Sequence, residues 1–397
     1  MTLSSKLKKA EANLPSPRKD PLWKGPEDSS SMGGVTFSLL ARWLGCRERF
    51  RIEMIEGLRP QRGFNVRIEF GNMWHLLEEE MAKGLSLING WCPAMQGVLK
   101  DYSQDLCRQY PTQTNEITKW YEIIRRQFPE YVLYWQKHTD ELESTPIDGL
   151  QEKVFHLPYN LPSRRVVYIK GKWDSVRLLG KGKSAKIYLM ENKTKGQIEE
   201  GKIRRQLSFD LQTMMYLVSI LESDIETVPP YPIGGVLYNV IRRPLSGGKG
   251  SIVQKKGSKN VRAESAQEYY DRLLKDYIRK EPETYFARWK VEITTEDITR
   301  FRRECLDPIL EQLCDWYSWI KVSNNPSLIP YNGPFSPDNG TENSLDKSVP
   351  SYVHYRHPFG LYNVLDEGGS SELDEYLSTG SMIGLEQVTE LFTELKE

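Results

Sequence analysis

Two apolar stretches in the middle of the chain have the residue pattern of β-strands. The first runs from Val166 to Leu179, is rich in β-branched and aromatic residues, and is followed by Gly180 and Gly182. The second, from Lys186 to Lys193, is largely apolar. Two such stretches separated by a glycine-containing turn indicate strands that are close in sequence and able to pair as a hairpin.

Charged residues end the second of these strands. Side chains alternate between the two faces of a strand, so Glu191 and Lys193 point the same way as Ile187 and Leu189. An acid and a lysine on an apolar strand are costly to bury unless they pair or hold a cation. Asp174 lies beside them if the two strands form a hairpin. Two carboxylates and a lysine predict a hard-oxygen site suited to Mg²⁺ or Mn²⁺.

Apolar residues recur at spacings of three and four elsewhere, and this periodicity predicts helices. Helices are expected over 35–50, 70–83, 201–221 and 265–279, within 90–143, and from Thr295 to about Ile320 with a kink at Pro308. Further strands are expected over 151–157, 231–240 and 284–293. The aromatic rings of 90–143 either build the core of a helical subdomain, which is the commoner role, or stack on DNA bases.

Composition restricts the class of protein. The chain has 397 residues, 54 basic and 54 acidic residues, and 39% hydrophobic residues. No apolar run approaches the roughly 20 residues that span a membrane. Residues 1–31 are polar, carry several lysines and lack the apolar core of a signal peptide. We therefore expect a cytoplasmic protein of a bacterium or a phage-infected cell, and the zero net charge argues against a nucleic-acid coat protein.

Local charge is uneven despite the zero net charge. Residues 241–263 contain seven basic residues and no acid, interrupted by glycines and serines. This composition predicts a mobile loop that either grips phosphates or is merely a solvated surface segment. The candidate DNA-binding residues within it are Arg242, Arg243, Lys255 and Lys256. The acidic segment 366–397 has one lysine. It is interpreted as a solubilising tail, and a docking tail is the less favoured alternative.

Four motifs carry a family resemblance. Asp174 together with Glu191-x-Lys193 resembles the D…(D/E)-x-K core of the PD-(D/E)XK nuclease superfamily. Three further motifs resemble those of its RecB-like branch, in the order of the family: the opening S-x-L…C-x-x-x-F segment within 37–50, G-x-x-x-H from Gly71 to His75, and Q-x-x-x-Y from Gln212 to Tyr216. Together they cover about half of the chain, and their order is more specific than any one of them.

The resemblance implies an α/β fold of restriction-endonuclease type, with a mixed central β-sheet flanked by helices. Residues 1–31 are then expected to be a disordered tail, and 32–240 the nuclease core with a helical insertion at about 90–145. The basic loop covers 241–264, a C-terminal α+β extension covers 265–365, and the acidic tail covers 366–397. Within the core, Glu152 on the strand 151–157 either approaches the site or stays on the surface, where strand acids are commoner.

The resemblance also implies roles for individual residues. Mg²⁺ or Mn²⁺ would be held by His75, Asp174, Glu191 and the backbone carbonyl of Asn192. Asp174, Glu191 and Lys193 would be the catalytic residues, with Lys193 orienting the attacking water and stabilising developing charge. Gln212 and Tyr216 would fix their helix against the site and help to position DNA.

The function that the resemblance implies is a metal-dependent DNA exonuclease acting on duplex ends in phage recombination, repair or DNA processing. A structure-selective endonuclease and a catalytically silent DNA-binding scaffold are the alternatives. The intact Asp174, Glu191 and Lys193 favour an enzyme, because a scaffold has no reason to keep a costly charged cluster. A recombination partner protein and a homo-oligomer both stay open.

Some RecB-like nucleases hold an iron–sulfur cluster with one early cysteine and three late ones. Cys46 has the early position here, but only Cys305 and Cys314 are late, and four thiolates are normally required. We therefore expect reduced cysteines that act as small buried hydrophobes.

Overall fold

The computed structural model describes residues 33–45, 50, 54–60, 63–138, 144–207, 210–223, 231–244, 253–257, 261–323 and 379–387. The predicted N-terminal tail, Cys46 and most of the acidic tail lie outside these ranges. The chain forms two compact units, one of residues 1–61, 155–171 and 299–397 and one of residues 62–154 and 172–298. All candidate site residues belong to the second unit, so it is described in more detail.

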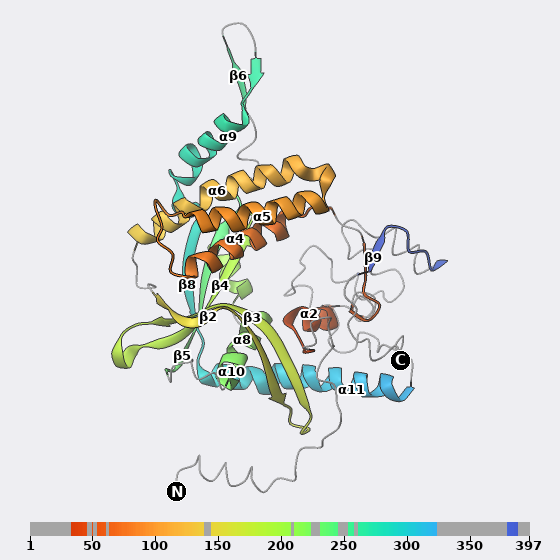
Figure 1. The fold of residues 1–397 in the computed structure, drawn as a ribbon. Coiled ribbons are helices and arrows are strands. Elements are labelled where there is room, and N and C mark those ends of the chain that lie inside the picture. The colour runs from red at the N-terminus through yellow and green to blue at the C-terminus, as the bar shows by residue number, and fades with distance from the viewer. Residues whose placement is uncertain are drawn as a thin grey trace. The chain divides into compact units, whose positions relative to one another are not determined.

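A mixed sheet of five strands in the order β2-β3-β4-β5-β8 is the centre of the fold (Figure 1). The strands are β2 (Ser144–Asn160), β3 (Val166–Leu179), β4 (Lys186–Lys195), β5 (Ile233–Arg242) and β8 (Phe286–Glu292). β4 pairs antiparallel with β3 and parallel with β5, and β5 pairs antiparallel with β8. The predicted hairpin and the predicted α/β fold are thus confirmed.

Two of the three inner strands, β4 and β5, are buried on both faces. Every residue of β4 from Ile187 to Asn192 is buried, and so is every residue of β5 from Gly234 to Ile241. Strands that are covered on both faces have continuous apolar runs in their sequence. For this reason, residues 186–193 lack the alternation of polar and apolar residues that is typical of a half-exposed strand. The few polar residues in these runs, Glu191 and Asn192 on β4 and Asn239 on β5, are therefore conspicuous.

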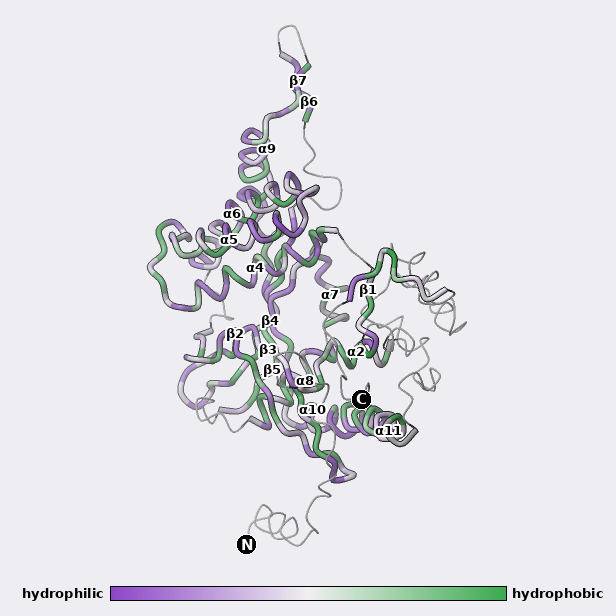
Figure 2. Tube along the Cα trace, turned by 45° about the vertical axis from the view of Figure 1, so that its right-hand side comes forward, coloured by the Kyte–Doolittle hydropathy of each residue, from purple (hydrophilic) through white to green (hydrophobic). Residues whose placement is uncertain are grey.

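Three helices of the second unit pack together around an apolar core (Figure 1). They are α4 (Val66–Ala82), α5 (Pro93–Gln109) and α6 (Thr114–Lys137). Figure 2 shows hydrophilic and hydrophobic stretches alternating along α5 and α6, as expected of amphipathic helices. The ring centroids of Trp74 and Phe128 are 4.9 Å apart, and Tyr131 is 2% exposed. These buried rings confirm the predicted core of a helical subdomain.

The prediction of a single helix over 201–221 is wrong. The segment contains two helices, α7 (Glu200–Leu207) and α8 (Leu211–Glu222). The side chain of Asp210 accepts a hydrogen bond from the backbone N–H of Thr213 at 3.3 Å and so caps the start of α8. Aspartate is a favourable N-cap residue, and Asp210 is therefore the local sequence signal for the start of α8.

The basic segment 241–263 is also more structured than predicted. Arg242 ends β5, and β6 (Gln254–Lys256) pairs antiparallel with β7 (Val261–Ala263). This hairpin leads into α9 (Ala266–Leu273), from which it projects in Figure 1. Lys255 lies opposite Arg262 in the pairing. The prediction of a loop is therefore wrong for the paired residues of this hairpin.

The long helix predicted from Thr295 is interrupted. It consists of α10 (Thr295–Phe301), a π-helical turn η6 (Arg302–Leu306) and α11 (Asp307–Ser323). The hydroxyl that caps it belongs to Thr294, whose Oγ accepts from the N–H of Asp297 at 3.2 Å. The π turn ends just before Pro308, which has no N–H to continue the regular ladder. The irregularity that was predicted as a kink at Pro308 is thus a π-helical turn that ends two residues before the proline.

The first unit has its own aromatic core. It contains α2 (Phe37–Gly45), the short antiparallel pair β1 (Leu58–Pro60) and β9 (Leu385–Gln387), and α11. The rings of Trp43 and Phe50 lie 5.4 and 5.3 Å from that of Trp316 on α11.

Among the described residues, no helix is both long enough and apolar enough to cross a membrane.

Replacing Gly235 with alanine is expected to destabilise the protein strongly. Gly235 on β5 has φ of +131°, and a Cβ added there would lie 2.1 Å from the carbonyl oxygen of Val291 on β8. The strained conformation and the backbone clash together predict a loss of about 3 kcal/mol or more. Urea denaturation would measure it. Gly97→Ala on α5, where a Cβ meets nothing within 4 Å, is the control and should be neutral or stabilising.

Candidate active site

The pairing of β3 with β4 brings the predicted acids together. Ser175 is paired with Met190, and the backbone N–H of Asn192 donates to Asp174 Oδ2 at 2.8 Å. Glu191 is the next residue along β4 and is 1% exposed. The hydrogen bond from Asn192 therefore fixes one carboxylate beside the other. The structure brings Asp174 and Glu191 together as the sequence predicted.

Lys193 is held by two partners. Its ammonium donates to Glu191 Oε2 and to Gln212 Oε1, each at 2.9 Å. Gln212 in turn donates from Nε2 to the hydroxyl of Tyr216 at 3.3 Å. α8 therefore covers the face of β4 that carries Glu191 and Lys193, and the glutamine and tyrosine fix the direction of the lysine.

His75 reaches the site from α4. Its Nδ1 is 3.5 Å from Glu152 Oε1 and 3.7 Å from Asp174 Oδ1. One ligand atom from each of these three residues lies within 4.8 Å of the other two. A nitrogen and two carboxylate oxygens that converge in this way can hold a divalent cation. The predicted proximity of His75 to the acids is confirmed.

Glu152 lies at the site. Of the two predicted alternatives, a place near the site and a place on the protein surface, the surface alternative is wrong. Its side chain is 6% exposed, and Oε2 lies 2.5 Å from the ammonium of Lys172. The backbone at Glu152 has φ of +48°, a conformation that residues with a side chain rarely adopt. No local feature of the sequence predicts this conformation. The position of Glu152 on the first core strand is the one sequence feature that indicates its place near the site.

The electrostatics of the site reflect burial of like charges. Burial raises the pKa of Glu191 to about 7, and the charge of Asp174 adds to the effect against the opposing charge of Lys193. Burial likewise raises the pKa of Asp174. For His75, burial acts to lower the pKa, but the charge of Asp174 and the contact with Glu152 outweigh it and raise the pKa to about 9. A bound cation would compensate these clustered carboxylates.

The residues present fit a divalent cation. Oε1 of Glu191 is buried and has no hydrogen-bond partner, and the contact of Oε1 of Glu152 with Nδ1 of His75 is a long one of 3.5 Å. An ionised oxygen that is buried without a partner is strongly unfavourable unless a cation or water binds it. Carboxylate oxygens with one imidazole suit Mg²⁺ and Mn²⁺, and the nitrogen ligand increases the preference for Mn²⁺.

Asn192 is positioned by a buried polar network that the sequence did not reveal. Its Oδ1 accepts from Nδ2 of Asn239, which also donates to the hydroxyl of Tyr131 on α6, both at 2.7 Å. Asn239 is paired with Asn192 in the parallel register of β4 and β5. The side chain of Asn192 is therefore engaged inside the protein, while its backbone N–H holds Asp174.

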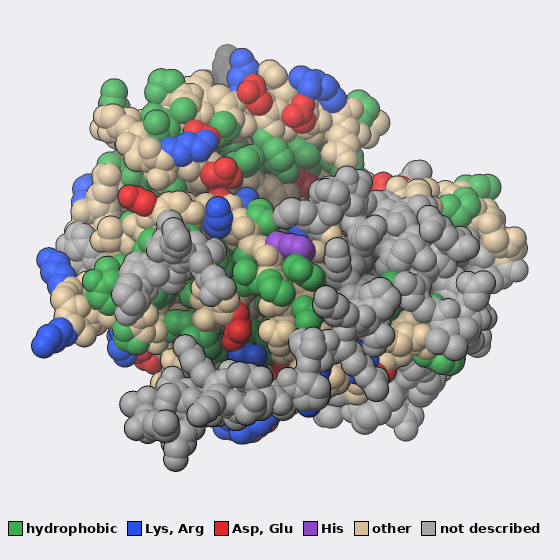
Figure 3. All heavy atoms as spheres, turned by 60° about the horizontal axis from the view of Figure 1, so that its bottom comes forward, with side chains coloured by type: hydrophobic (Ala, Val, Ile, Leu, Met, Phe, Trp, Pro, Cys, Tyr) green, Lys and Arg blue, Asp and Glu red, His purple; other side chains and the backbone are tan. Residues whose placement is uncertain are grey.

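The predicted phosphate-binding residues have different surroundings. Arg242 lies over the ring of Tyr285 at 5.2 Å, and burial lowers the pKa of the half-buried Arg243. Lys255 is 3.2 Å from Glu268, whereas Lys256 is exposed. On the face shown in Figure 3, acidic and basic side chains are interspersed. Lys255 is thus already compensated within the protein, and Lys256 is the more available charge on the hairpin.

The chain also matches a known family of proteins. The family model of the PD-(D/E)XK nuclease superfamily matches residues 35–315. This range covers more than half of the chain and contains all the residues of the site. No curated protein sequence matches the chain. Nucleases of this superfamily depend on divalent metal ions, which agrees with the acidic cluster of His75, Glu152 and Asp174. The chain therefore belongs to the PD-(D/E)XK nuclease superfamily.

Proposed function

We propose that the protein is a Mg²⁺- or Mn²⁺-dependent deoxyribonuclease that digests double-stranded DNA from its ends. The observation that carries the proposal is the contact of Lys193 with Glu191 beside Asp174, on two paired strands. The ordered RecB-like motifs support the exonuclease mode and a role in phage recombination, repair or DNA processing.

In this proposal the acids hold the cation and the lysine acts on the substrate. Asp174, Glu191 and the backbone carbonyl of Asn192 would be its ligands, and His75 and Glu152 would complete the set. The bound cation supplies positive charge at the scissile phosphate and lowers the pKa of a water. Lys193 orients the attacking water and stabilises the charge that develops on the phosphate. Gln212 and Tyr216 keep the ammonium aimed at that position, because small misplacements are costly.

Contacts to DNA away from the site would come from basic side chains. Arg242, Arg243 and Lys256 are the proposed phosphate contacts. Lys255 can contribute only by exchanging its ion pair with Glu268 for a phosphate. Replacing Lys256 is therefore expected to weaken DNA binding at low salt more than replacing Lys255.

The mode of cleavage is tested by comparing linear and closed circular duplex DNA of the same sequence. With Mg²⁺ or Mn²⁺, we expect the linear DNA to be degraded progressively from its ends while the closed circles persist. Asp174→Ala is the control for a contaminating nuclease and should leave both substrates intact. Nicking of closed circles as fast as digestion of linear DNA would favour the endonuclease alternative. Intact DNA under all conditions would favour the silent scaffold.

A further inference from the structure

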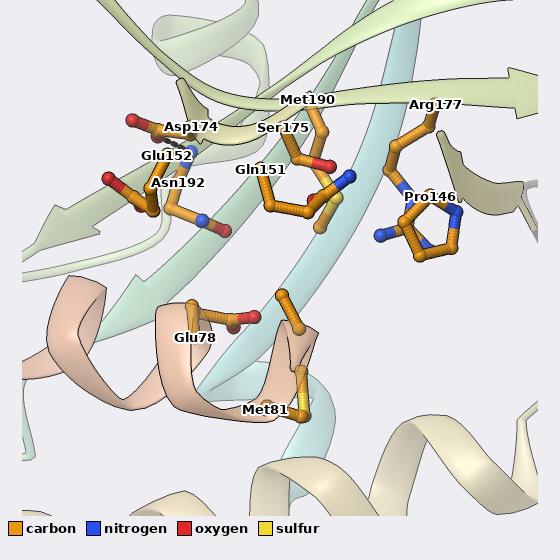
Figure 4. Close-up of a pocket in the computed structure, with 11 residues that line it drawn as sticks. Glu78, Met81, Pro146, Gln151, Glu152, Asp174, Ser175, Arg177, Met190 and Asn192 are labelled. Atoms are coloured by element: carbon orange, nitrogen blue, oxygen red, sulfur yellow. Dashed lines mark hydrogen bonds between the residues drawn. The ribbon is translucent and has the colours of Figure 1, made fainter. Parts of the chain in front are cut away.

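A cavity of about 210 Å³ lies between α4 and the strands β2, β3 and β4 (Figure 4). A single water needs only about 10–15 Å³ of such space, so the cavity accommodates a much larger group. At its rim, Ala82 and Pro146 are exposed, whereas Ser175 and Asn192 deeper inside are each 6% exposed. The cavity is therefore an opening from the surface toward the sheet.

Two polar atoms that line this cavity have no hydrogen-bond partner in the protein. Oγ of Ser175 and Oε1 of Glu78 are both buried without a hydrogen bond. Figure 4 shows Ser175 and Gln151 facing Glu78 of α4 across the space. Buried polar atoms normally have partners, and two such atoms without a partner around one cavity indicate a ligand with donors and acceptors.

Apolar surface forms the remaining walls. Met81 on α4 and Met190 on β4 contribute thioethers, and Pro146 contributes a ring at the rim. Methionine side chains adapt to the shape of a flat apolar group and interact favourably with aromatic rings. The walls therefore fit a planar group whose faces are apolar and whose edges form hydrogen bonds.

The charges around the cavity disfavour an anion. The carboxyl groups of Glu78, Glu152 and Asp174 line it together with one cationic side chain, Arg177. The guanidinium of Arg177 is already engaged, because its Nε donates to the hydroxyl of Ser144 at 2.7 Å. A phosphate placed here would lie against these carboxyl groups, whereas a neutral group would meet no charge repulsion.

The cavity is continuous with the proposed metal site. Asp174 and Asn192 line the cavity and are also joined by the hydrogen bond that fixes the site. A group in the cavity would therefore be a near neighbour of a phosphate held at the cation. In a DNA strand, the neutral and planar group nearest to a phosphate is the base of an adjoining nucleotide.

We propose that this cavity receives one unstacked nucleobase of the cleaved strand, from a nucleotide next to the scissile phosphate. The inference rests on the proposed function as a DNA nuclease. Enzymes that extract a base read its edge by hydrogen bonds and enclose its faces with apolar side chains. Unstacking costs least where the base is unpaired, so the protein selects frayed or mismatched positions at a duplex end.

The test compares DNA with and without a base at one position. The protein carries Lys193→Ala to keep the DNA intact, and its affinity for labelled duplexes is measured by fluorescence anisotropy with Mn²⁺. Each duplex has one abasic nucleotide, placed at successive positions from the end. Ala82→Trp is added to fill the mouth of the cavity. Ile68→Trp is the matched control, because Ile68 is an exposed residue of the same helix that does not line the cavity.

We expect Ala82→Trp to weaken binding of intact DNA about tenfold, the size of one base contact. The same variant should bind DNA that is abasic at one particular position with unchanged affinity, since no base then needs the cavity. Ile68→Trp should leave both affinities as they were. Ser175→Ala is a second variant that removes an unpartnered hydroxyl without filling space. It should not lower the melting temperature, but should weaken binding of intact DNA several-fold and spare the abasic DNA.

Two results would overturn the inference. If folded Ala82→Trp protein bound intact DNA as well as the control does, the cavity would receive no base. If Ala82→Trp and Ser175→Ala weakened binding equally for every abasic position, the effect would be independent of a base. Failure of the Lys193→Ala protein to bind any DNA would instead contradict the proposed function itself, together with this inference.

Discussion

Lys193→Ala is expected to slow DNA cleavage by about 10²–10³-fold, the usual effect of removing one group that stabilises charge in a transition state. The ammonium of Lys193 has two fixed acceptors, Glu191 and Gln212, so it is already directed before substrate binds. The measurement is the single-turnover rate of digestion of linear duplex DNA with saturating Mn²⁺.

The same variant should still bind the cation, because Asp174 and Glu191 are unchanged. Isothermal titration with Mn²⁺ separates a lost lysine from a lost metal site. Lys186→Ala is the matched control, since Lys186 is an exposed lysine at the opposite end of β4. Equal cleavage rates for Lys193→Ala and Lys186→Ala would remove Lys193 from the proposed chemistry.

Glu191→Gln is expected to have opposite effects on stability with and without metal. Burial raises the pKa of Glu191 from its ordinary value of 4.5 to about 7. The ionised carboxylate is therefore unfavourable in the folded protein without a cation, and the neutral amide relieves this cost. At pH 8 with a chelator, we expect the variant to be more stable by on the order of 1–3 kcal/mol, since one pKa unit is about 1.4 kcal/mol.

The pH dependence has a definite sign. A carboxyl group with a raised pKa in the folded state costs stability above its unfolded pKa, and the cost is complete once the pH passes the folded pKa. Without metal, the gain in the free energy of unfolding from Glu191→Gln should therefore grow between about pH 4.5 and 7 and vanish below pH 4.5. Chemical denaturation at several pH values would show it. Glu283→Gln, at an exposed glutamate, should change stability at none of them.

Adding metal should reverse the order. At a Mn²⁺ concentration a hundredfold above the dissociation constant, a protein that binds the ion only when folded gains about 2.7 kcal/mol. The unmodified protein should show this gain, and Glu191→Gln should show little of it, because a neutral amide is a weak ligand. If the variant were less stable without metal, or stabilised equally by it, Glu191 would not be a buried metal ligand.

The sequence predicts the centre of the site because that part is local. Asp174, Glu191 and Lys193 lie on two strands that are adjacent in the chain, and the alternation of strand side chains decides which of them share a face. The spacing of Gln212 and Tyr216 likewise follows from one helical turn. The short range of these relations made the prediction possible.

The residues that the sequence left open or did not reveal come from more distant elements. Glu152 depends on a positive φ within β2, and Asn239 depends on the parallel pairing of β5 with β4. Neither the backbone conformation nor a parallel register follows from local composition. The break before α8 cannot be read from the apolar spacing, because that spacing continues across Asp210. The hairpin that contains Lys255 resembles a loop in sequence, because its strands are short and have few hydrophobic residues.

The most direct test of the central claim is the anomalous scattering of Mn²⁺ in crystals of the protein soaked with that ion. The account predicts a peak bounded by the carboxylates of Asp174 and Glu191, with the carbonyl of Asn192 among the ligands and the ammonium of Lys193 nearby. Asp174→Ala crystals treated in the same way should lack the peak. Manganese bound elsewhere, with these two carboxylates free of it, would contradict the account.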